Sequence, residues 1–510
     1  MKQSDHYEAR WESLIEYGVP DWMRDEKFGL YAHWGLYSVP GFGMEWYGKR
    51  MYEPGHPIHE QHVETYGSPA RFGYKDFIPQ FTAEHYDPAA WAELFEYSGA
   101  GYAGFSLAHH DGFGLWDSDV YEWNVGKKGP KRDLYGELAT ALRERNMRLV
   151  APFHIIRGFN WFLPGWNQWE QTWDEAAVSH GTARGWDLYD PDYAGLYQHQ
   201  LVGATFERFL ADWKAKVKEV IDAYRPDLMW FDGGRFSEAD LQDHSLEVLS
   251  YYLNRSDQWG KQVCVLNKLP VSMTFNFHPE FGVWQFEEGR DRPASGAIPG
   301  VEPAVSVDDH LWNDDMRVGD KSWGWVRDQV YKSGRELIHG LIDRTARGGS
   351  LMLSLSPKAD GTIPEGQSTP LRELGDWLSA HREAIHGTRP FSVHAEGDEA
   401  KLLEEPRRGH RKWTFTSCGP DDLRYTRSKD GKTVYAFSLG APTSPVRFSA
   451  LGKTAGHLGG RIESVTRLSD GRPADYRWDN TALHVEVHPE VERVEAGDRV
   501  ATVWKVLVAG

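Results

Sequence analysis

The chain has 510 residues, which is too long for one small module and fits two or three domains. Its 57 Lys and Arg against 75 Asp and Glu give a formal net charge of −18 at pH 7, which disfavours binding to nucleic acid or to an anionic membrane. The two cysteines, Cys264 and Cys418, exclude a disulfide framework and a cysteine-rich metal site.

The chain begins with mixed polar residues and contains no run of 18 apolar residues. We therefore expect a soluble protein with no signal peptide in the given sequence, either cytoplasmic or exported with its signal removed. Residues 27–32 predict a first strand that runs into His33. Glu45 and Trp46 follow in a Gly-containing loop, where a carboxylate beside an aromatic ring could hold a sugar hydroxyl. His56, His59 and His62 lie near two prolines, and we expect a solvated surface there rather than a metal site.

A repeated pattern occupies about the first 390 residues: an amphipathic helix, a short break, an apolar run of four to seven residues, and then polar residues. The predicted helices are 89–98, 134–146, 209–224 and 334–346. The predicted strands are 102–107, 148–153, 227–231, 262–266 and 350–355, with a further strand around 283–286.

Near-continuous apolar strands separated by helices predict a parallel sheet covered on both faces. The number of units favours a closed (β/α)8-like TIM barrel over an open sheet, and the Gly-rich dinucleotide signature is absent after the first strand. Catalytic groups of such barrels lie where strands end. The polar residues at these ends are His33, His109, His110, His154, Asp232 and Lys268.

Aromatic residues are abundant, with 23 each of Trp, Tyr and Phe. A long stretch between Trp161 and Tyr197 contains five tryptophans among Gly and Pro residues. Long loops in compact domains are usually functional or disordered, and this much Trp argues against disorder. Aromatic rings stack on the apolar face of a sugar, so we expect this stretch to form part of the rim of a site.

After about residue 390 the pattern changes to short alternating runs at 413–416, 433–438 and 482–487, separated by Gly-containing turns. Regularly spaced short strands of this kind predict a β-sandwich. We therefore divide the chain into a barrel domain, 1–388, and a C-terminal β-sandwich domain, 389–510.

Asp232 is the strongest catalytic candidate, because a carboxylate at the end of a buried strand is costly unless a site uses it. The alternative is a cap for the next helix. His109 and His110 could bind a metal or substrate hydroxyls, and adjacent strand residues point to opposite faces, which disfavours a shared ion. Glu287 and Glu288 form a carboxylate pair near a predicted strand end.

Several motifs in register resemble the α-L-fucosidases of glycoside hydrolase family 29. They are KFGLYAHWGLYSVP at 27–40, EWYG at 45–48, HHDGF at 109–113, GPKRD at 129–133, WFDG at 230–233 and GGSLML at 348–353. The resemblance runs from about residue 10 to 390, and the β-rich tail is similar to that family's C-terminal sandwich. It implies a retaining exo-glycosidase that releases terminal α-L-fucose without a cofactor or a metal.

The resemblance also implies residue roles. Asp232 matches the nucleophile and Glu287 the acid/base, with Glu288 and Glu280 as open alternatives. The positions that surround the fucose ring match His33, Glu45, Trp46, His109, His110 and Trp230, and we expect His154 and Lys268 to join them in binding substrate. The expected partner is a fucosylated oligosaccharide or glycoside. The oligomeric state is left open, with a homo-oligomer as one alternative.

The chain departs from the family pattern at three positions. Ala108 occupies a position where the family usually has Lys, and Ser354 occupies one where it usually has Asn. The segment that begins at His154 takes the place of a Tyr-Ser pattern in the family. These changes leave two alternatives open: a glycosidase of this family that acts on another sugar, and a carbohydrate-binding protein without turnover on a degenerate barrel.

Overall fold

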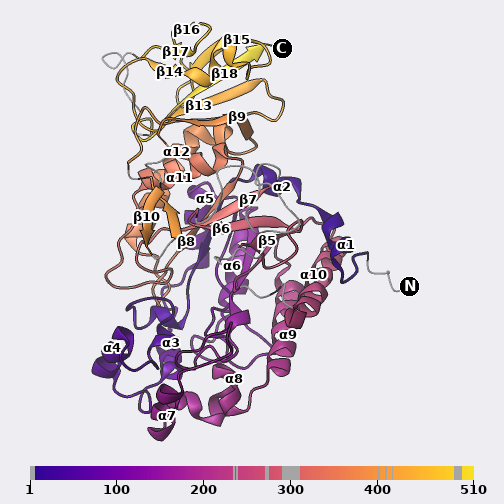
Figure 1. Cartoon of the computed structure of the whole chain (residues 1–510), viewed down its shortest axis with the longest axis vertical. Coiled ribbons are helices and arrows are strands. Elements are labelled where there is room, and N and C mark those ends of the chain that lie inside the picture. Colours follow the sequence, from indigo (N-terminus) through magenta and orange to yellow (C-terminus); the bar gives the residue numbers. More distant parts are fainter. Residues whose placement is uncertain are drawn as a thin grey trace.

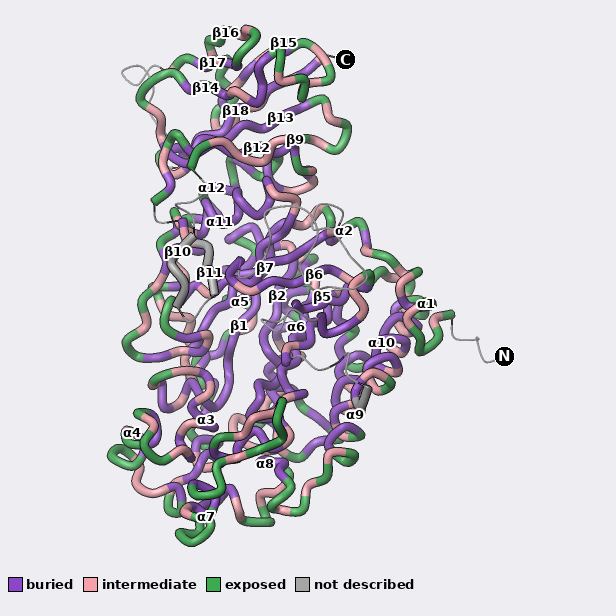
Figure 2. The backbone as a smooth tube through the Cα atoms, in the orientation of Figure 1, coloured by how far each residue is buried: buried purple, intermediate pink, exposed green. Residues whose placement is uncertain are grey.

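The computed structural model of the chain describes residues 6–233, 236, 239–269, 275–289, 310–398, 403–407, 410–415, 417–487 and 497–509. Eight parallel strands close into a barrel in chain order, and the last strand pairs with the first. The strands are β1 (Phe28–Ala32), β2 (Tyr102–Gly104), β3 (Arg148–Phe153), β4 (Leu228–Phe231), β5 (Cys264–Lys268), β6 (Val283–Glu287), β7 (Trp312–Arg317) and β8 (Ser350–Leu355). The predicted barrel is confirmed, and Figure 2 shows its strands buried at the centre.

Helices α5, α6, α9, α10 and α11 connect strands of the barrel, and α12 follows β8 and leads to the C-terminal sheets. The helices are α1 (Trp11–Leu14), α2 (Asp21–Asp25), α3 (Tyr47–Arg50), α4 (Pro57–Tyr66), α5 (Pro88–Tyr97), α6 (Leu134–Glu144), α7 (Glu175–Ala183), α8 (Ala194–Tyr197), α9 (Phe206–Tyr224), α10 (Ala239–Trp259), α11 (Gly334–Ala346) and α12 (Glu365–Ile385). At the start of α9 the Thr205 hydroxyl accepts from the backbone N–H of Arg208, and the helix ends at Tyr224, two residues before Pro226. Local caps of this kind explain why the predicted helix positions are close to the observed ones.

β7 is the barrel strand that the sequence pattern did not predict. Its residues, WNDDMR, include two adjacent carboxylates, and such a run does not read as a buried strand. Both carboxylates have buried partners: Asp314 is paired with Arg344, and Asp315 accepts hydrogen bonds from Tyr31 and Gln285. The predicted strand 102–107 is also shortened, because β2 ends at Gly104, although the backbone of Ser106 and Leu107 still donates to Ala32 and Pro152.

The expectation of a solvated surface at the first histidine cluster was wrong. His59 and His62 lie on α4 and are buried. His62 bonds through one ring nitrogen to the Tyr47 hydroxyl and through the other to the Phe72 carbonyl oxygen. Both histidines therefore belong to the packing of the segment after β1.

Two antiparallel sheets face each other in the C-terminal part. Five strands, in the order β15-β18-β13-β12-β9, pack on three, in the order β14-β17-β16. Their shared core includes Tyr425, Phe448, Leu483 and Val506, as a β-sandwich requires, so this prediction is confirmed. The strands are β9 (Arg389–Glu396), β10 (Leu403–Arg407), β11 (His410–Trp413), β12 (Leu423–Arg427), β13 (Thr433–Ser438), β14 (Val446–Phe448), β15 (Arg461–Arg467), β16 (Tyr476–Trp478), β17 (Leu483–Val485) and β18 (Thr502–Ala509); β10 and β11 form a separate hairpin.

The sandwich docks on α11 and α12 at one end of the molecule, and the segments with α3, α4, α7 and α8 lie at the other end (Figure 1). A buried ion pair joins Asp343 on α11 to Arg424 on β12 at 2.6 Å, and the Trp377 indole donates to the Ala501 carbonyl. The proposed division at 388/389 falls between α12 and β9 and stays a prediction.

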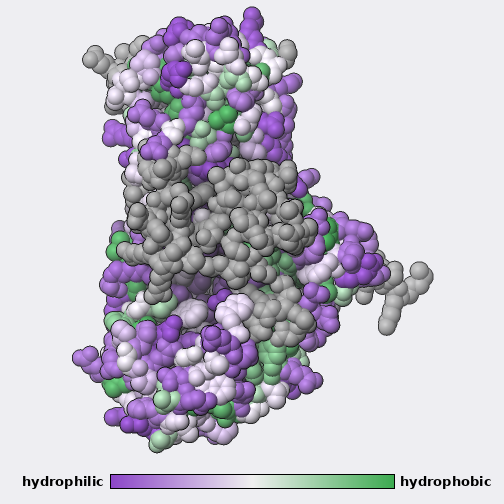
Figure 3. All heavy atoms as spheres, in the orientation of Figure 1, coloured by the Kyte–Doolittle hydropathy of each residue, from purple (hydrophilic) through white to green (hydrophobic). Residues whose placement is uncertain are grey.

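The described surface in the view of Figure 3 is mostly hydrophilic, with small separate hydrophobic patches. Within the described ranges, no helix has both the length and the apolar character that a membrane crossing requires.

Candidate active site

A single cavity at the carboxyl ends of the barrel strands gathers the ten residues to which the sequence analysis assigned a catalytic or substrate-binding role. It encloses about 1530 Å³ of non-protein space, counting the part that opens to solvent. Its lining includes His33, Glu45, Trp46, His109, His110, His154, Trp230, Asp232, Lys268 and Glu287. These side chains come from segments after β1, β2 and β3 and from the ends of β4, β5 and β6.

Asp232 follows β4 and is held by its backbone N–H, which donates to the Phe153 carbonyl at 2.9 Å. Its carboxylate accepts a hydrogen bond from the Lys268 ammonium at 2.6 Å. Burial by itself raises the pKa of Asp232, but the positive charge of Lys268 and its neighbours outweighs burial and holds the pKa well below its usual range. Asp232 is therefore ionised at neutral pH, as a nucleophile or an electrostatic stabiliser must be.

Lys268 contacts two carboxylates at once. Its Nζ lies 2.6 Å from Asp232 Oδ1 and 3.1 Å from Glu287 Oε2, so these two oxygens cannot be more than about 5.7 Å apart. Carboxyl groups of inverting glycosidases are about 6.5–9.5 Å apart, and those of retaining ones about 5–5.5 Å. The arrangement fits the shorter spacing.

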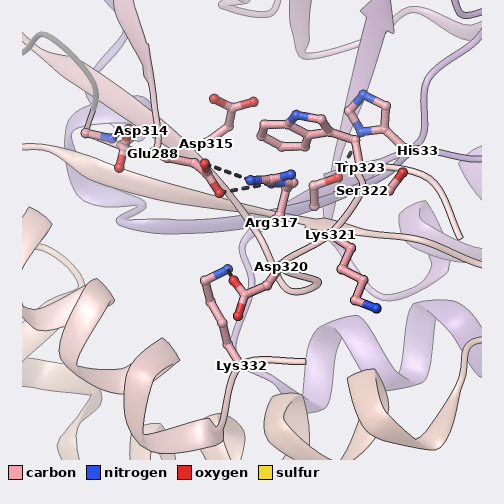
Figure 4. A network of polar contacts seen from close by, with 12 residues as sticks. His33, Glu288, Asp314, Asp315, Arg317, Asp320, Lys321, Ser322, Trp323 and Lys332 are labelled. Carbon is pink, nitrogen blue, oxygen red and sulfur yellow. Dashed lines mark hydrogen bonds and ion pairs between the residues drawn. The ribbon is translucent and has the colours of Figure 1, made fainter. Parts of the chain in front are cut away.

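Glu287 and Glu288 have different surroundings, although they are adjacent. Glu287 ends β6 and lines the cavity. Glu288 has a positive φ of 54° and is fully buried, and Arg317 donates to its two oxygens at 3.0 and 3.1 Å (Figure 4). Of this adjacent pair, Glu287 lines the cavity and Glu288 does not. Glu280 is exposed and does not line the cavity.

Four histidines lie close together on one side of the cavity. Burial lowers the pKa of His110 to about 3 and of His154 to about 4, and holds the pKa values of His33 and His109 well below the usual range. All four are neutral at physiological pH, and a neutral imidazole can donate one hydrogen bond and accept another. This is the chemistry that sugar hydroxyls need.

Local contacts orient these rings. The Nδ1–H of His110 donates to the His154 carbonyl, which leaves His110 Nε2 as an acceptor. His33 Nδ1 is 2.9 Å from the Ser354 hydroxyl, and His154 Nδ1 is 2.9 Å from the Ser106 hydroxyl. Two of the positions that depart from the family pattern therefore lie at this histidine cluster: His154 belongs to it, and Ser354 contacts it through His33.

The geometric reason given against a shared metal ion does not hold at His109 and His110. The chain has left β2 before them, both rings line the cavity, and their centroids are 4.3 Å apart. Over the described ranges, however, no three or more His, Cys, Asp or Glu side chains are arranged to hold a metal ion.

The sequence analysis missed five residues that line the cavity: Met44, Arg50, Arg157, Asp315 and Trp323. The last three have contacts that bear on the site. Asp315 comes from the unpredicted strand β7 and accepts from the Tyr31 hydroxyl at 3.0 Å; burial raises its pKa well above its usual range. Trp323 lies beside His33 (Figure 4), and its backbone N–H donates to Glu45. Arg157 follows β3, in a segment where only the Trp content signalled a site. No motif in the sequence indicated these three residues.

Comparisons with known proteins agree with this geometry. A family model described as "Alpha-L-fucosidase" matches residues 1–383. The tissue alpha-L-fucosidase of Rattus norvegicus is 31% identical over 405 residues, covering 77% of this chain and 75% of the relative. The plasma alpha-L-fucosidase of the same species is 29% identical over 485 residues, covering 92% and 86%. The crystal structure of Thermotoga maritima alpha-fucosidase in complex with fucose superimposes with a TM-score of 0.71 at 26% identity, covering 98% of this chain and all of that one.

Proposed function

The chain belongs to the alpha-L-fucosidase family, and from this premise we propose that Asp232 and Glu287 hydrolyse a terminal α-L-fucoside in the barrel cavity with retention of configuration. The substrate is a fucosylated oligosaccharide or glycoside. No metal ion or organic cofactor is needed for the two displacements.

In the first step, a carboxylate oxygen of Asp232 attacks the anomeric carbon while the bond to the glycosidic oxygen breaks. Glu287 donates its proton to that leaving oxygen. In the second step, Glu287 takes a proton from water as the water attacks the anomeric carbon, and the bond to Asp232 breaks. The products are fucose and the free aglycone.

The observation that carries this proposal is the position of Lys268 between the two carboxylates. It supports a short separation of the two groups, which leaves no room for a water molecule between an inverting base and the sugar. The ammonium also favours the ionised form of Asp232, which a nucleophile requires.

The remaining lining residues suit a sugar ring. The Trp46 ring stands edge-on to His110, and Trp230 packs against Tyr31 and His154. Glu45 is held in place by the Ser322 hydroxyl at 2.9 Å. Aromatic faces next to neutral hydrogen-bonding groups match the apolar face and the hydroxyls of fucose.

The test is hydrolysis of aryl α-L-fucoside, aryl β-D-galactoside and a fucosylated oligosaccharide, with NMR detection of the anomer formed first. We expect activity on the fucosides and initial release of α-L-fucose. Asp232→Ala should lower turnover by several orders of magnitude with the fold intact, and azide should partly restore it.

Other outcomes would select the alternatives. Binding of fucosides without any turnover would favour a carbohydrate-binding protein, and preference for the galactoside would favour another sugar. Near-native turnover in Asp232→Ala would remove this residue from the mechanism.

A further inference from the structure

A second cavity lies beside the catalytic one, in the segment between β3 and α9. It encloses about 1240 Å³ of non-protein space, counting the part that opens to solvent. Aromatic rings of Phe159, Trp166 and Phe206 and amide side chains of Gln168, Gln171 and Gln200 contribute to its lining. None of these residues touches the glycosidic centre described above.

The two cavities are neighbours through Arg157, which lines both. The Arg157 guanidinium donates through Nε to the carbonyl of Gly233, the residue directly after Asp232. Gly233 has a φ of 132°, and a Cβ there would lie 2.5 Å from Ile156. Any side chain at this position would therefore displace Ile156 or the backbone that Arg157 contacts. Trp169, 56% exposed, lines the catalytic cavity only three residues from Trp166. One short stretch of chain thus forms the wall of both cavities.

Ring contacts and a backbone hydrogen bond fix the aromatic floor of the second cavity. Trp166 stacks on Trp173, with ring centroids 6.2 Å apart, and its carbonyl accepts from Lys49 Nζ at 3.0 Å. Phe159 packs against Phe206 at 5.3 Å. A rigid apolar floor binds a ring at a lower entropic cost than flexible side chains would.

The polar part of the lining is neutral. Among the described residues that line this cavity, Arg157 carries the only charged side chain. Gln200 is exposed, and its backbone N–H is fixed by Asn160 at 2.9 Å. Amides can donate to and accept from hydroxyl groups, whereas sites for carboxylates or sulfates gather cations. The combination of rings and amides is typical of a site for an uncharged saccharide.

We propose that this cavity is an aglycone subsite, which binds a neutral sugar residue of the oligosaccharide that carries the terminal fucose. This inference rests on the proposed function, because it assumes that fucose occupies the first cavity. It assigns the preferred substrate class: fucosylated oligosaccharides whose aglycone is long enough to pass Arg157, in preference to short fucosides.

The test compares kcat/KM on an aryl α-L-fucoside and on fucosylated oligosaccharides with aglycones of one, two and three neutral sugars. The wild-type efficiency should rise with aglycone length. Gln200→Ala should lower efficiency on the longest substrate by about fivefold, and Trp166→Ala by about tenfold or more, mainly through KM. On the aryl fucoside both variants should stay within about twofold, which also reports an intact fold.

Leu201→Ala is the matched control, because Leu201 is 45% exposed, adjacent to Gln200, and lines neither cavity. This substitution should leave kcat/KM unchanged on both substrates. Calorimetric binding of the longest substrate to Asp232→Ala, with and without Gln200→Ala, gives a second readout that does not need turnover.

Failure of the two proposals can be told apart. Absence of any fucoside hydrolysis in the wild type would overturn the proposed function. The aglycone subsite alone would be overturned if kcat/KM did not depend on aglycone length. It would also be overturned if the two variants lost kcat/KM equally on the aryl fucoside and on the oligosaccharide. A gain confined to sialylated or sulfated aglycones would replace it with an anion site at Arg157.

Discussion

Lys268 is the residue on which the electrostatics of the cavity depend. It contacts both carboxylates, lies 5.6 Å from the centre of the Trp230 ring, and is itself buried. Its two ion pairs raise its pKa, so it keeps its charge although burial opposes this. A cation that stays charged over the whole working range can keep Asp232 ionised at low pH.

Lys268→Met should therefore change the pH profile as well as the rate. Without the ammonium, the pKa of Asp232 rises, the nucleophile is protonated at higher pH, and the acid limb of kcat/KM moves toward neutral pH. The measurement is kcat/KM on an aryl fucoside from pH 3 to 8. Lys218→Met, which removes a partly exposed lysine paired with Glu247, is the control and should leave the profile in place. If Lys268→Met lowered kcat/KM without moving the acid limb of the pH profile, the role of Lys268 would be restricted to substrate binding.

The acid/base assignment is tested by the leaving group. Loss of the true acid slows a poor leaving group far more than an activated phenol, because the phenol departs with little protonation. We expect Glu287→Ala to lower the rate on an activated aryl fucoside much less than the rate on natural oligosaccharide. Glu288→Ala should lower the rates on both substrates about equally. A selective loss at Glu288 or Glu280 would move the assignment there and leave Asp232 as the nucleophile.

At the scale of elements, one buried ion pair joins the ends of β6 and β7, and a second joins β7 to α11. Glu288 is fully buried against Arg317, which is 13% exposed, and Asp314 is buried against Arg344. Removing one partner of a buried pair leaves the other charge uncompensated. These pairs allow a strand as polar as β7 to complete the barrel.

Glu288→Ala should therefore lower the free energy of unfolding by about 3–5 kcal/mol, as expected when a buried ion pair loses one partner. Glu383→Ala, which breaks a solvent-exposed pair with Lys505, should cost no more than about 1 kcal/mol. Denaturant unfolding of both variants measures the difference. Equal small losses would mean that Arg317 finds another partner in the folded protein.

At the scale of the whole molecule, the hydrophobic cluster of the barrel extends to one face of the sandwich, whose two sheets enclose a separate core. Phe415, Phe437 and Val503 belong to the same hydrophobic cluster as the barrel strands. His339 on α11 lies in this interface, fully buried, and its Nε2–H donates to the Val500 carbonyl at 2.8 Å. Burial lowers the pKa of His339 to about 4, so the ring is neutral in the folded protein.

This histidine should make the interface between the barrel and the sandwich sensitive to acid. Between its folded pKa of about 4 and the unfolded value of about 6.5, the unfolded chain binds more protons, so stability falls as pH falls. His339→Gln keeps an N–H donor for Val500 without the titration. From pH 7 to pH 5, wild type should lose about 2 kcal/mol more unfolding free energy than His339→Gln, as measured by denaturant unfolding. Parallel losses in the two proteins would contradict a neutral His339 in the folded state.

The sequence by itself determined the barrel, the sandwich and the identities of the proposed site residues. Apolar runs such as 148–153 and 350–355 coincide with β3 and β8, because a buried parallel strand needs an apolar side chain at nearly every position. Polar residues directly after such strands lie at the carboxyl edge by topology alone. This is why Asp232, His154 and Lys268 could be assigned to one site.

Only the tertiary structure decided what depends on partners far away in the chain. β7 is a strand because Arg344 and Tyr31 satisfy its carboxylates, and no local pattern contains that information. Glu287 and Glu288 are equivalent in sequence; Arg317 buries one, whereas Lys268 meets the other in the cavity. The second cavity beside Arg157 likewise forms only when the segment after β3 folds back toward Asp232. Local sequence sets strand and helix periodicity, but long-range charge pairing determines which polar side chains the site contains.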